Sequence, residues 1–178
     1  MNDLLPNLLA PDRLNELGPA EPNVAMRADL EALPHKLVVK DRDFAQACYA
    51  GLWLLHDFID ESHNISQELD TIEGSAWHGI LHRREPDYWN AKYWFRRVPA
   101  HPIFADLRES AAALTLEAKT PAGSEYLLTQ KSWDSAAFVD LCEKAARGPD
   151  ALTMLCKRIQ RREWDLLFAY CCERAFIH

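Results

Sequence analysis

Glycine is too scarce in this chain to supply the turns of a β-sheet protein. Only 6 of the 178 residues are glycine, and they occur singly rather than in clusters. An all-β fold needs frequent glycine-rich turns between short strands. The sequence has no βαβ pattern and no glycine-rich phosphate loop, which excludes the Rossmann and P-loop classes. We therefore predict an all-α fold, a single-domain helical bundle of roughly six to eight helices, two of them long.

The apolar residues between the prolines have helical spacing. Long helices are expected over residues 41–62 and 151–176. Shorter helices are expected over 76–84, 87–97, 103–119 and 135–147, the last capped by Asp134. On the final helix, a solvated face is expected from Arg158, Arg161, Arg162 and Glu163.

The first 22 residues differ in composition from the rest. They hold four of the ten prolines, which prevents a long helix there. Leucines recur through the same segment. We predict that residues 1–22 form a proline-rich arm packed on the body of a single domain that spans 1–178.

Charge and hydropathy exclude several classes of partner. The net charge of −7 argues against a general nucleic-acid binder, which normally presents a basic face. No apolar run approaches the ~18–20 residues of a membrane span, and the N-terminus lacks the basic region of a secretory signal. The five cysteines lack C-x-x-C spacing, which favours reduced thiols. We expect a cytoplasmic protein that binds neither nucleic acid nor membrane.

A polar cluster ends the first long helix, in the run H-D-F-I-D-E-S-H. On a continuous helix His56, Asp60 and His63 share one face, because they lie at positions i, i+4 and i+7. Asp57 and Glu61 point elsewhere and are the candidate catalytic carboxylates, which would orient the histidines. A buried carboxylate is costly unless it is paired or coordinated, so this cluster should have partners.

The next helix repeats the spacing with His78, His82 and Glu85. If the two helices pack antiparallel with these polar faces toward each other, their imidazoles and carboxylates come together, as they do in the metal sites of helical bundles. Nitrogen and oxygen ligands suit zinc, iron or manganese. The candidate metal ligands are His56, Asp60, His63, His78, His82 and Glu85.

The signatures of several metal-dependent families are absent from both clusters. The paired E-x-x-H of di-iron bundles and the H-E-x-x-H of metalloproteases do not occur. The pair His56-Asp57 precedes the other clustered histidines, which is the reverse of the order in HD-type phosphohydrolases. The alternative is that these groups form a structural network that bridges neighbouring helices.

A basic, aromatic run covers residues 75–101 of this acidic chain. Guanidinium groups beside aromatic walls suit a small anionic ligand that carries a carboxylate or phosphate. On the helix 87–97, one face is shared by Asn90, Trp94 and Arg97. The candidate ligand-binding residues are Arg83, Arg84, Trp89, Asn90, Lys92, Tyr93, Arg96 and Arg97. The alternative is that the aromatic rings are core and the arginines pair with Asp57 and Glu61.

Three stretches carry a family resemblance: H-D-F-I-D-E-S-H, W-H-G-I-L-H-R-R-E-P-D-Y-W-N-A-K-Y-W-F-R-R and H-P-I-F. Together they resemble a family of uncharacterised bacterial proteins over residues 50–105. The resemblance implies that these stretches are the functional centre, and it implies no particular activity.

Two functions remain open. In the first, the polar pocket performs metal-assisted or acid–base chemistry on a small anionic ligand, such as hydrolysis, elimination or oxidation. In the second, the chain is a non-catalytic interaction protein. The arm and the aromatic helices would then form a partner or homodimer interface, and the polar cluster would be structural. A concave site with converging histidines favours the first, and full mutual pairing favours the second.

Overall fold

The computed structural model describes residues 7–177, and within that range the chain is all-α, as predicted. The α-helices are α2 (Arg27–Ala32), α3 (Arg42–Leu55), α4 (Ile59–Ser66), α5 (Ile72–Arg84), α6 (Tyr88–Phe95), α7 (Phe104–Glu117), α8 (Ser135–Ala145) and α9 (Asp150–Ala175). Short 3-10 helices are η1 (Val24–Met26), η2 (Leu33–His35) and η3 (Glu125–Leu128). The described β-pairing is one isolated antiparallel bridge between Val39 and Phe176.

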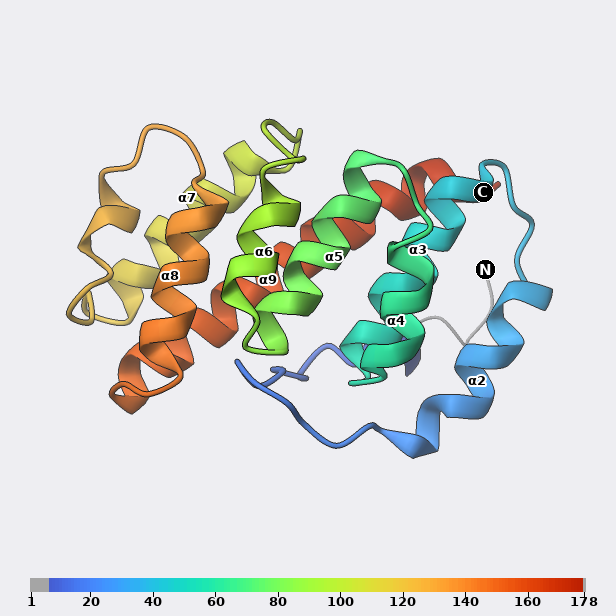
Figure 1. The fold of residues 1–178 in the computed structure, drawn as a ribbon, viewed down its shortest axis with the longest axis horizontal. Coiled ribbons are helices and arrows are strands. Elements are labelled where there is room, and N and C mark those ends of the chain that lie inside the picture. Colours follow the sequence, from blue (N-terminus) through green and yellow to red (C-terminus); the bar gives the residue numbers. More distant parts are fainter. Residues whose placement is uncertain (1–6, 178) are drawn as a thin grey trace.

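The 26-residue helix α9 is the axis of the fold. It crosses the length of the molecule behind α8, α6, α5 and α3 (Figure 1). It contacts α3 at one end, and α7 and α8 at the other. Its buried apolar side chains, such as Leu152, Ile159 and Cys171, keep the helical spacing of the sequence. Two apolar clusters result, one around α3 and α5 and one around α7 and α8, and Leu166 packs against both.

Side-chain caps set the starts of several helices. The carboxylate of Asp134 accepts a hydrogen bond from the Ala137 amide, which confirms the predicted cap of α8. The Thr71 hydroxyl accepts from the Gly74 amide, so α5 begins at Ile72, four residues before the predicted start at 76.

The predicted continuous helix over 41–62 is wrong, because the chain breaks after Leu55. Asp57 has φ of 64°, in the left-handed region. The Phe58 amide donates to the Trp53 carbonyl at 3.0 Å, and the Asp57 amide donates to the Leu54 carbonyl at 3.2 Å. This pair of hydrogen bonds is a Schellman motif, and the rings of Trp53 and Phe58 add its usual apolar contact. The chain then restarts as α4 in a new direction.

The described part of the N-terminal arm packs on the body. Leu8 is buried in the cluster around α3, and Leu17 is buried in the cluster around α7 and α8. The guanidinium of Arg161 in α9 donates to the carbonyls of Leu9, Ala10 and Arg13. Residues 1–6 of the predicted arm lie outside the described residues.

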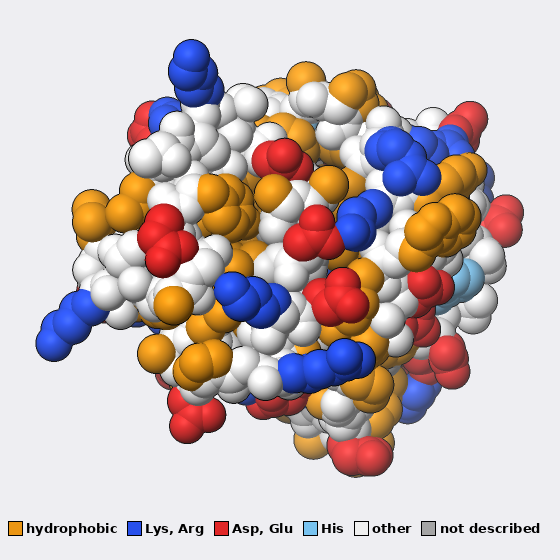
Figure 2. All heavy atoms as spheres, turned by 60° about the vertical axis from the view of Figure 1, so that its left-hand side comes forward, with side chains coloured by type: hydrophobic (Ala, Val, Ile, Leu, Met, Phe, Trp, Pro, Cys, Tyr) orange, Lys and Arg blue, Asp and Glu red, His pale blue; other side chains and the backbone are white. Residues whose placement is uncertain are grey.

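The surface shows mixed chemistry. On the face in Figure 2, acidic, basic and apolar side chains are interspersed. Among the helices of residues 7–177, none is long and apolar enough to cross a membrane.

Candidate functional site

Three helices bring their polar side chains together: α4, α5 and α6. α5 contacts both α4 and α6. Gly79 permits the close approach of α6, because a Cβ at this position would lie 3.0 Å from the ring of Phe95. This packing places the histidines of α5 between α4 and the polar face of α6.

The centre of the site is a cluster of three imidazoles, His63 from α4 and His78 and His82 from α5. One donor nitrogen from each lies within 4.8 Å of the others. The ring centroids are 4.6 Å apart for His63 and His78, 4.6 Å for His78 and His82, and 5.5 Å for His63 and His82. His78 and His82 are buried and His63 is half-buried, so the cluster is open on the α4 side.

Side chains of α6 and its flanks surround the cluster. The Trp94 ring stacks on His78, with centroids 4.0 Å apart and planes 14° apart. The Asn90 amide lies 3.1 Å from Nε2 of His82. A carboxylate oxygen of Glu85 lies 2.8 Å from the other ring nitrogen, Nδ1, although without good hydrogen-bond alignment. Arg97 lies over the Trp94 ring.

Burial makes these imidazoles weak bases. Burial lowers the pKa of His78 to about 3, helped by the neighbouring His82 and His63. Burial also lowers the pKa of His82, although Glu85 opposes the shift. Near neutral pH both rings are therefore neutral, which is the form that binds metal ions. Within the described residues, Nδ1 of His78 is buried with no hydrogen-bond partner.

The depressed pKa of His78 predicts a loss of stability in acid. This histidine is protonated near pH 6.5 in the unfolded chain but only near pH 3 in the folded protein. Its contribution to the free energy of unfolding is therefore fully present above about pH 6.5 and is lost as pH falls toward 3. The slope from this one histidine can reach ~1.4 kcal/mol per pH unit. Urea unfolding of metal-free protein at several pH values should show a shallower slope for His78→Phe, whose ring can still stack on Trp94. His35→Asn, at an exposed position, should leave the slope unchanged. Equal slopes for wild type and His78→Phe would contradict this origin.

Of the predicted residues of the first run, His63 joins the cluster, whereas His56, Asp57, Asp60 and Glu61 lie outside it. His56 caps the arm instead, since its Nε2 lies 2.9 Å from the Leu8 carbonyl and its Nδ1 lies 3.2 Å from the Asn23 amide. Asp60 is exposed. Glu61 forms a half-exposed ion pair with Arg27 at 2.5 Å. The helix break explains the position of His56, because the i, i+4, i+7 alignment needs one continuous helix. Asp60 lies on the same helix as His63, but its side chain is on the exposed side of α4.

Asp57, the other candidate catalytic carboxylate, is buried, with 3% of its side chain exposed. Its carboxylate pairs with the guanidinium groups of Arg84 and Arg13, and Asn15 donates to it at 3.1 Å. Arg84 also donates to the Leu54 carbonyl at 2.6 Å, and Arg13 donates to the Leu55 carbonyl at 2.7 Å. These side chains bind the last carbonyls of α3, so the Asp57 carboxylate stabilises the helix break.

The two buried arginines of α5 face protein rather than a pocket. Arg84 pairs with Asp57, as above. Arg83 pairs with Glu163 of α9 at 2.6 Å, with 1% and 3% of the two side chains exposed. The expected solvated face of α9 is therefore wrong at Glu163. The alternative interpretation, in which the arginines pair with Asp57 and Glu61, is right for Arg84 and Asp57. It is wrong for the other carboxylate, because Arg83 pairs with Glu163 and Glu61 pairs with Arg27.

The remaining predicted ligand-binding residues spread over the outer surface of α6. Lys92 pairs with Asp140 of α8. Trp89 is 73% exposed and stacks on Tyr93, and Arg96 lies over the Tyr93 ring. Arg97 pairs with Asp70 at 2.9 Å. The predicted residues that contact the three imidazoles or the stacked Trp94 are thus Glu85, Asn90, Tyr93 and Arg97.

Trp94 was missed as a site residue. Its spacing from Asn90 and Arg97 already placed it on the polar face of α6, so the sequence held the signal. Arg13 and Asn15 were also missed as partners of Asp57. They lie more than 40 residues away in the chain, and no local pattern indicates such a contact.

Comparisons with known proteins give no relative for this site. No family model matches the chain, and neither the curated proteins nor the solved structures contain a match. The resemblance carried by the three stretches between residues 50 and 105 stays a prediction.

Proposed function

We propose that this protein binds a divalent transition metal ion through His63, His78 and His82 and uses it on a small anionic ligand. One observation carries the proposal: three imidazole nitrogens converge within 4.8 Å from two helices. No hydrogen bond joins the three rings among the described residues, so the acceptor nitrogen of each ring could instead bind a shared cation. The buried, unpartnered Nδ1 of His78 supports the same interpretation.

Zinc fits this donor set better than manganese, because imidazole ligands suit zinc and iron and manganese prefers oxygen. Zinc bonds nitrogen at ~2.0–2.1 Å, so the three rings would close by about 1–2 Å around the ion. Three histidines leave a fourth position for water or substrate, the arrangement of catalytic rather than structural zinc. A zinc ion there would supply a bound water with a pKa near ~7, and hydrolysis is the reaction class that such water supports.

The residues around the three histidines have supporting roles in this proposal. Glu85, with a carboxylate oxygen 2.8 Å from Nδ1 of His82, would orient that ring, and Nε2 would then be available to hold the metal. Asn90, now in contact with Nε2 of His82, would give up that contact when the metal binds and could donate to the ligand instead. Trp94 fixes the plane of His78 by stacking. The anion-binding role falls to the exposed Arg96 and Arg97, because Arg83 and Arg84 are held in buried ion pairs and Lys92 pairs with Asp140. Arg97 would have to exchange its surface pair with the exposed Asp70 for the ligand.

Metal titration tests the proposal. Calorimetry of chelator-treated wild-type protein with zinc chloride should give one equivalent bound, with a dissociation constant below about 1 µM. His63→Ala and His78→Ala should each weaken binding at least ~10–100-fold, because each removes one of three ligands. His35→Ala and His56→Ala are the matched controls and should retain zinc binding. Less than about 0.1 equivalent of zinc in the wild type would refute the metal site.

The second candidate function is a non-catalytic interaction domain, favoured by the exposure of the stacked Trp89 and Tyr93 on α6. Exposed aromatic rings of this size often mark a contact surface. Many of the charged residues predicted to line a pocket also form ion pairs with other side chains of the protein. In this alternative the histidine cluster only packs α4 against α5, and the titration above would show no stoichiometric zinc binding.

A further inference from the structure

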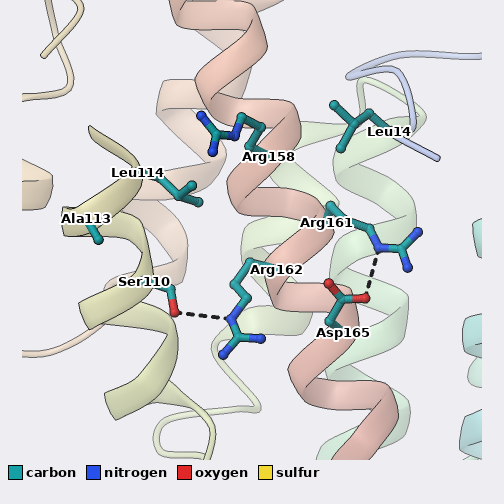
Figure 3. A pocket seen from close by; sticks show the side chains of 8 residues that line it. All are labelled: Leu14, Ser110, Ala113, Leu114, Arg158, Arg161, Arg162 and Asp165. Atoms are coloured by element: carbon teal, nitrogen blue, oxygen red, sulfur yellow. Dashed lines mark hydrogen bonds and ion pairs between the residues drawn. The ribbon is translucent and has the colours of Figure 1, made fainter. Parts of the chain in front are cut away.

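A hollow lined by residues far from the clustered histidines in the sequence lies between α7, α9 and the N-terminal arm (Figure 3). Its volume is about 420 Å³, which lies within the range of small-molecule sites. One part of its wall is apolar, formed by Leu14 of the arm and by Ala113 and Leu114 of α7. The other part is lined by the polar side chains Ser110, Arg158, Arg161, Arg162 and Asp165.

The three arginines of the hollow differ in how many hydrogen-bond and ion-pair partners they have. Arg161 donates to Asp165 at 2.9 Å and to carbonyls of the arm, so it serves the fold. Arg158 pairs with Glu117 at 2.8 Å. Arg162 donates through Nε to the Ser110 hydroxyl at 3.1 Å, the contact drawn between α9 and α7 in Figure 3. Among the described residues, its terminal nitrogens Nη1 and Nη2 have no hydrogen-bond partner.

Ser110 adds a second donor beside this guanidinium. Its oxygen accepts from Arg162, and its own hydroxyl proton has no acceptor among the described residues. Two guanidinium N–H groups and one O–H group therefore stand at the rim of an apolar wall. Of the three cations in the lining, Arg158 pairs with Glu117 and Arg161 pairs with Asp165, which leaves Arg162 as the cation of the lining without a carboxylate partner among the described residues.

We propose that this hollow binds a small amphipathic monocarboxylate. The carboxylate would accept two parallel hydrogen bonds from the terminal nitrogens of Arg162 and a third from Ser110. Its apolar tail would cover Leu14 and Leu114, which are partly exposed in the structure. Because Leu14 belongs to the arm, the ligand would also bridge the arm to α7. This site is independent of the histidine cluster and of any metal there.

Octanoate is a suitable probe, because it pairs one carboxylate with a short apolar tail. Calorimetric titration of the full chain with octanoate should show saturable 1:1 binding, with a dissociation constant of about 1 mM or lower for so few atoms. Octanol, which lacks the charge, should bind at least ~10-fold more weakly. Acetate, which lacks the tail, should show no saturable binding over the same range.

Substitutions locate the site. Arg162→Gln should weaken octanoate binding at least ~10-fold. Arg162→Lys should have an affinity between those of the wild type and Arg162→Gln, because lysine keeps the charge but cannot form two parallel hydrogen bonds with a carboxylate. Arg174→Gln, near the other end of α9, is the matched control and should bind as the wild type does. Circular dichroism and thermal melting would establish that each variant is folded. The proposal is overturned if octanoate fails to saturate by about 10 mM, if octanol binds equally well, or if Arg162→Gln retains wild-type affinity.

Discussion

Asp57→Asn is expected to lower the free energy of unfolding by about 3–5 kcal/mol, the range found when one member of a buried ion pair is removed. The Asp57 carboxylate is the charge partner of Arg84, and both side chains are almost fully buried, with 3% and 2% exposed. Without that carboxylate, the guanidinium of Arg84 stays buried and uncompensated. The hydrogen bonds that close α3 at Leu54 and Leu55 also lose their anchor. Urea unfolding followed by circular dichroism measures the effect.

Asparagine is the informative replacement, because it preserves the shape of the side chain and tolerates the left-handed φ of 64°. Alanine would add backbone strain to the loss of charge. Glu61→Gln is the matched control, since it removes a carboxylate from a half-exposed ion pair with Arg27 and should cost less than about 1 kcal/mol. A similar decrease in the free energy of unfolding for the two variants would show that the Asp57 carboxylate does not compensate the buried charge of Arg84.

The helices were predictable from the sequence because their signals are local. Apolar spacing along α9 and the Asp134 cap of α8 each depend on a few consecutive residues, and the structure confirms both. The break after Leu55 was not predicted. It is a Schellman motif whose left-handed residue is Asp57 rather than the usual glycine. Only the apolar pair Trp53 and Phe58, at the spacing that this motif uses, gave a local hint.

That missed break decided which of the predicted metal ligands come together. His78 and His82 lie on the uninterrupted helix α5, so their i, i+4 spacing survived in the structure. His63 also reaches the cluster, because α4 packs directly on α5. His56 precedes the turn at Asp57, and its ring instead meets the arm at Leu8. A single helical wheel cannot anticipate a change of direction within its window.

The arginines show a different limit. The sequence indicates that Arg83 and Arg84 need anionic partners, but it does not indicate whether the partner is a ligand or a carboxylate elsewhere in the chain. Either partner would neutralise a buried guanidinium group. The partners here are Asp57, across a helix break, and Glu163, 80 residues along the chain. Glu163 itself belonged to a run of charges that looked solvated, and only packing of α9 against α5 reveals its burial.

Glu163→Gln is expected to destabilise the protein by about 3–5 kcal/mol, because Arg83 then keeps a buried charge without a counter-ion. The double variant Arg83→Met/Glu163→Met should recover most of that loss and unfold within about 1–2 kcal/mol of the wild type. Within the described residues, Nε and Nη1 of Arg83 are buried without hydrogen-bond partners, so the native pair is incompletely satisfied. Such a pair is readily replaced by apolar side chains of similar volume.

The double variant also separates the fold from the candidate site. A flexible thioether at position 83 can fill the space beside Phe138, where the guanidinium now lies 4.8 Å from the ring centroid. Gln160 loses its contact with Arg83 but keeps the carbonyls of Asn15 and Glu16 as acceptors. Zinc stoichiometry should therefore be unchanged in the double variant, since no histidine is disturbed. The single variants Arg83→Met and Glu163→Met complete the comparison. If the double variant lost as much stability as these two variants together, the interaction energy between Arg83 and Glu163 would be zero and the pair would not be a coupled structural unit.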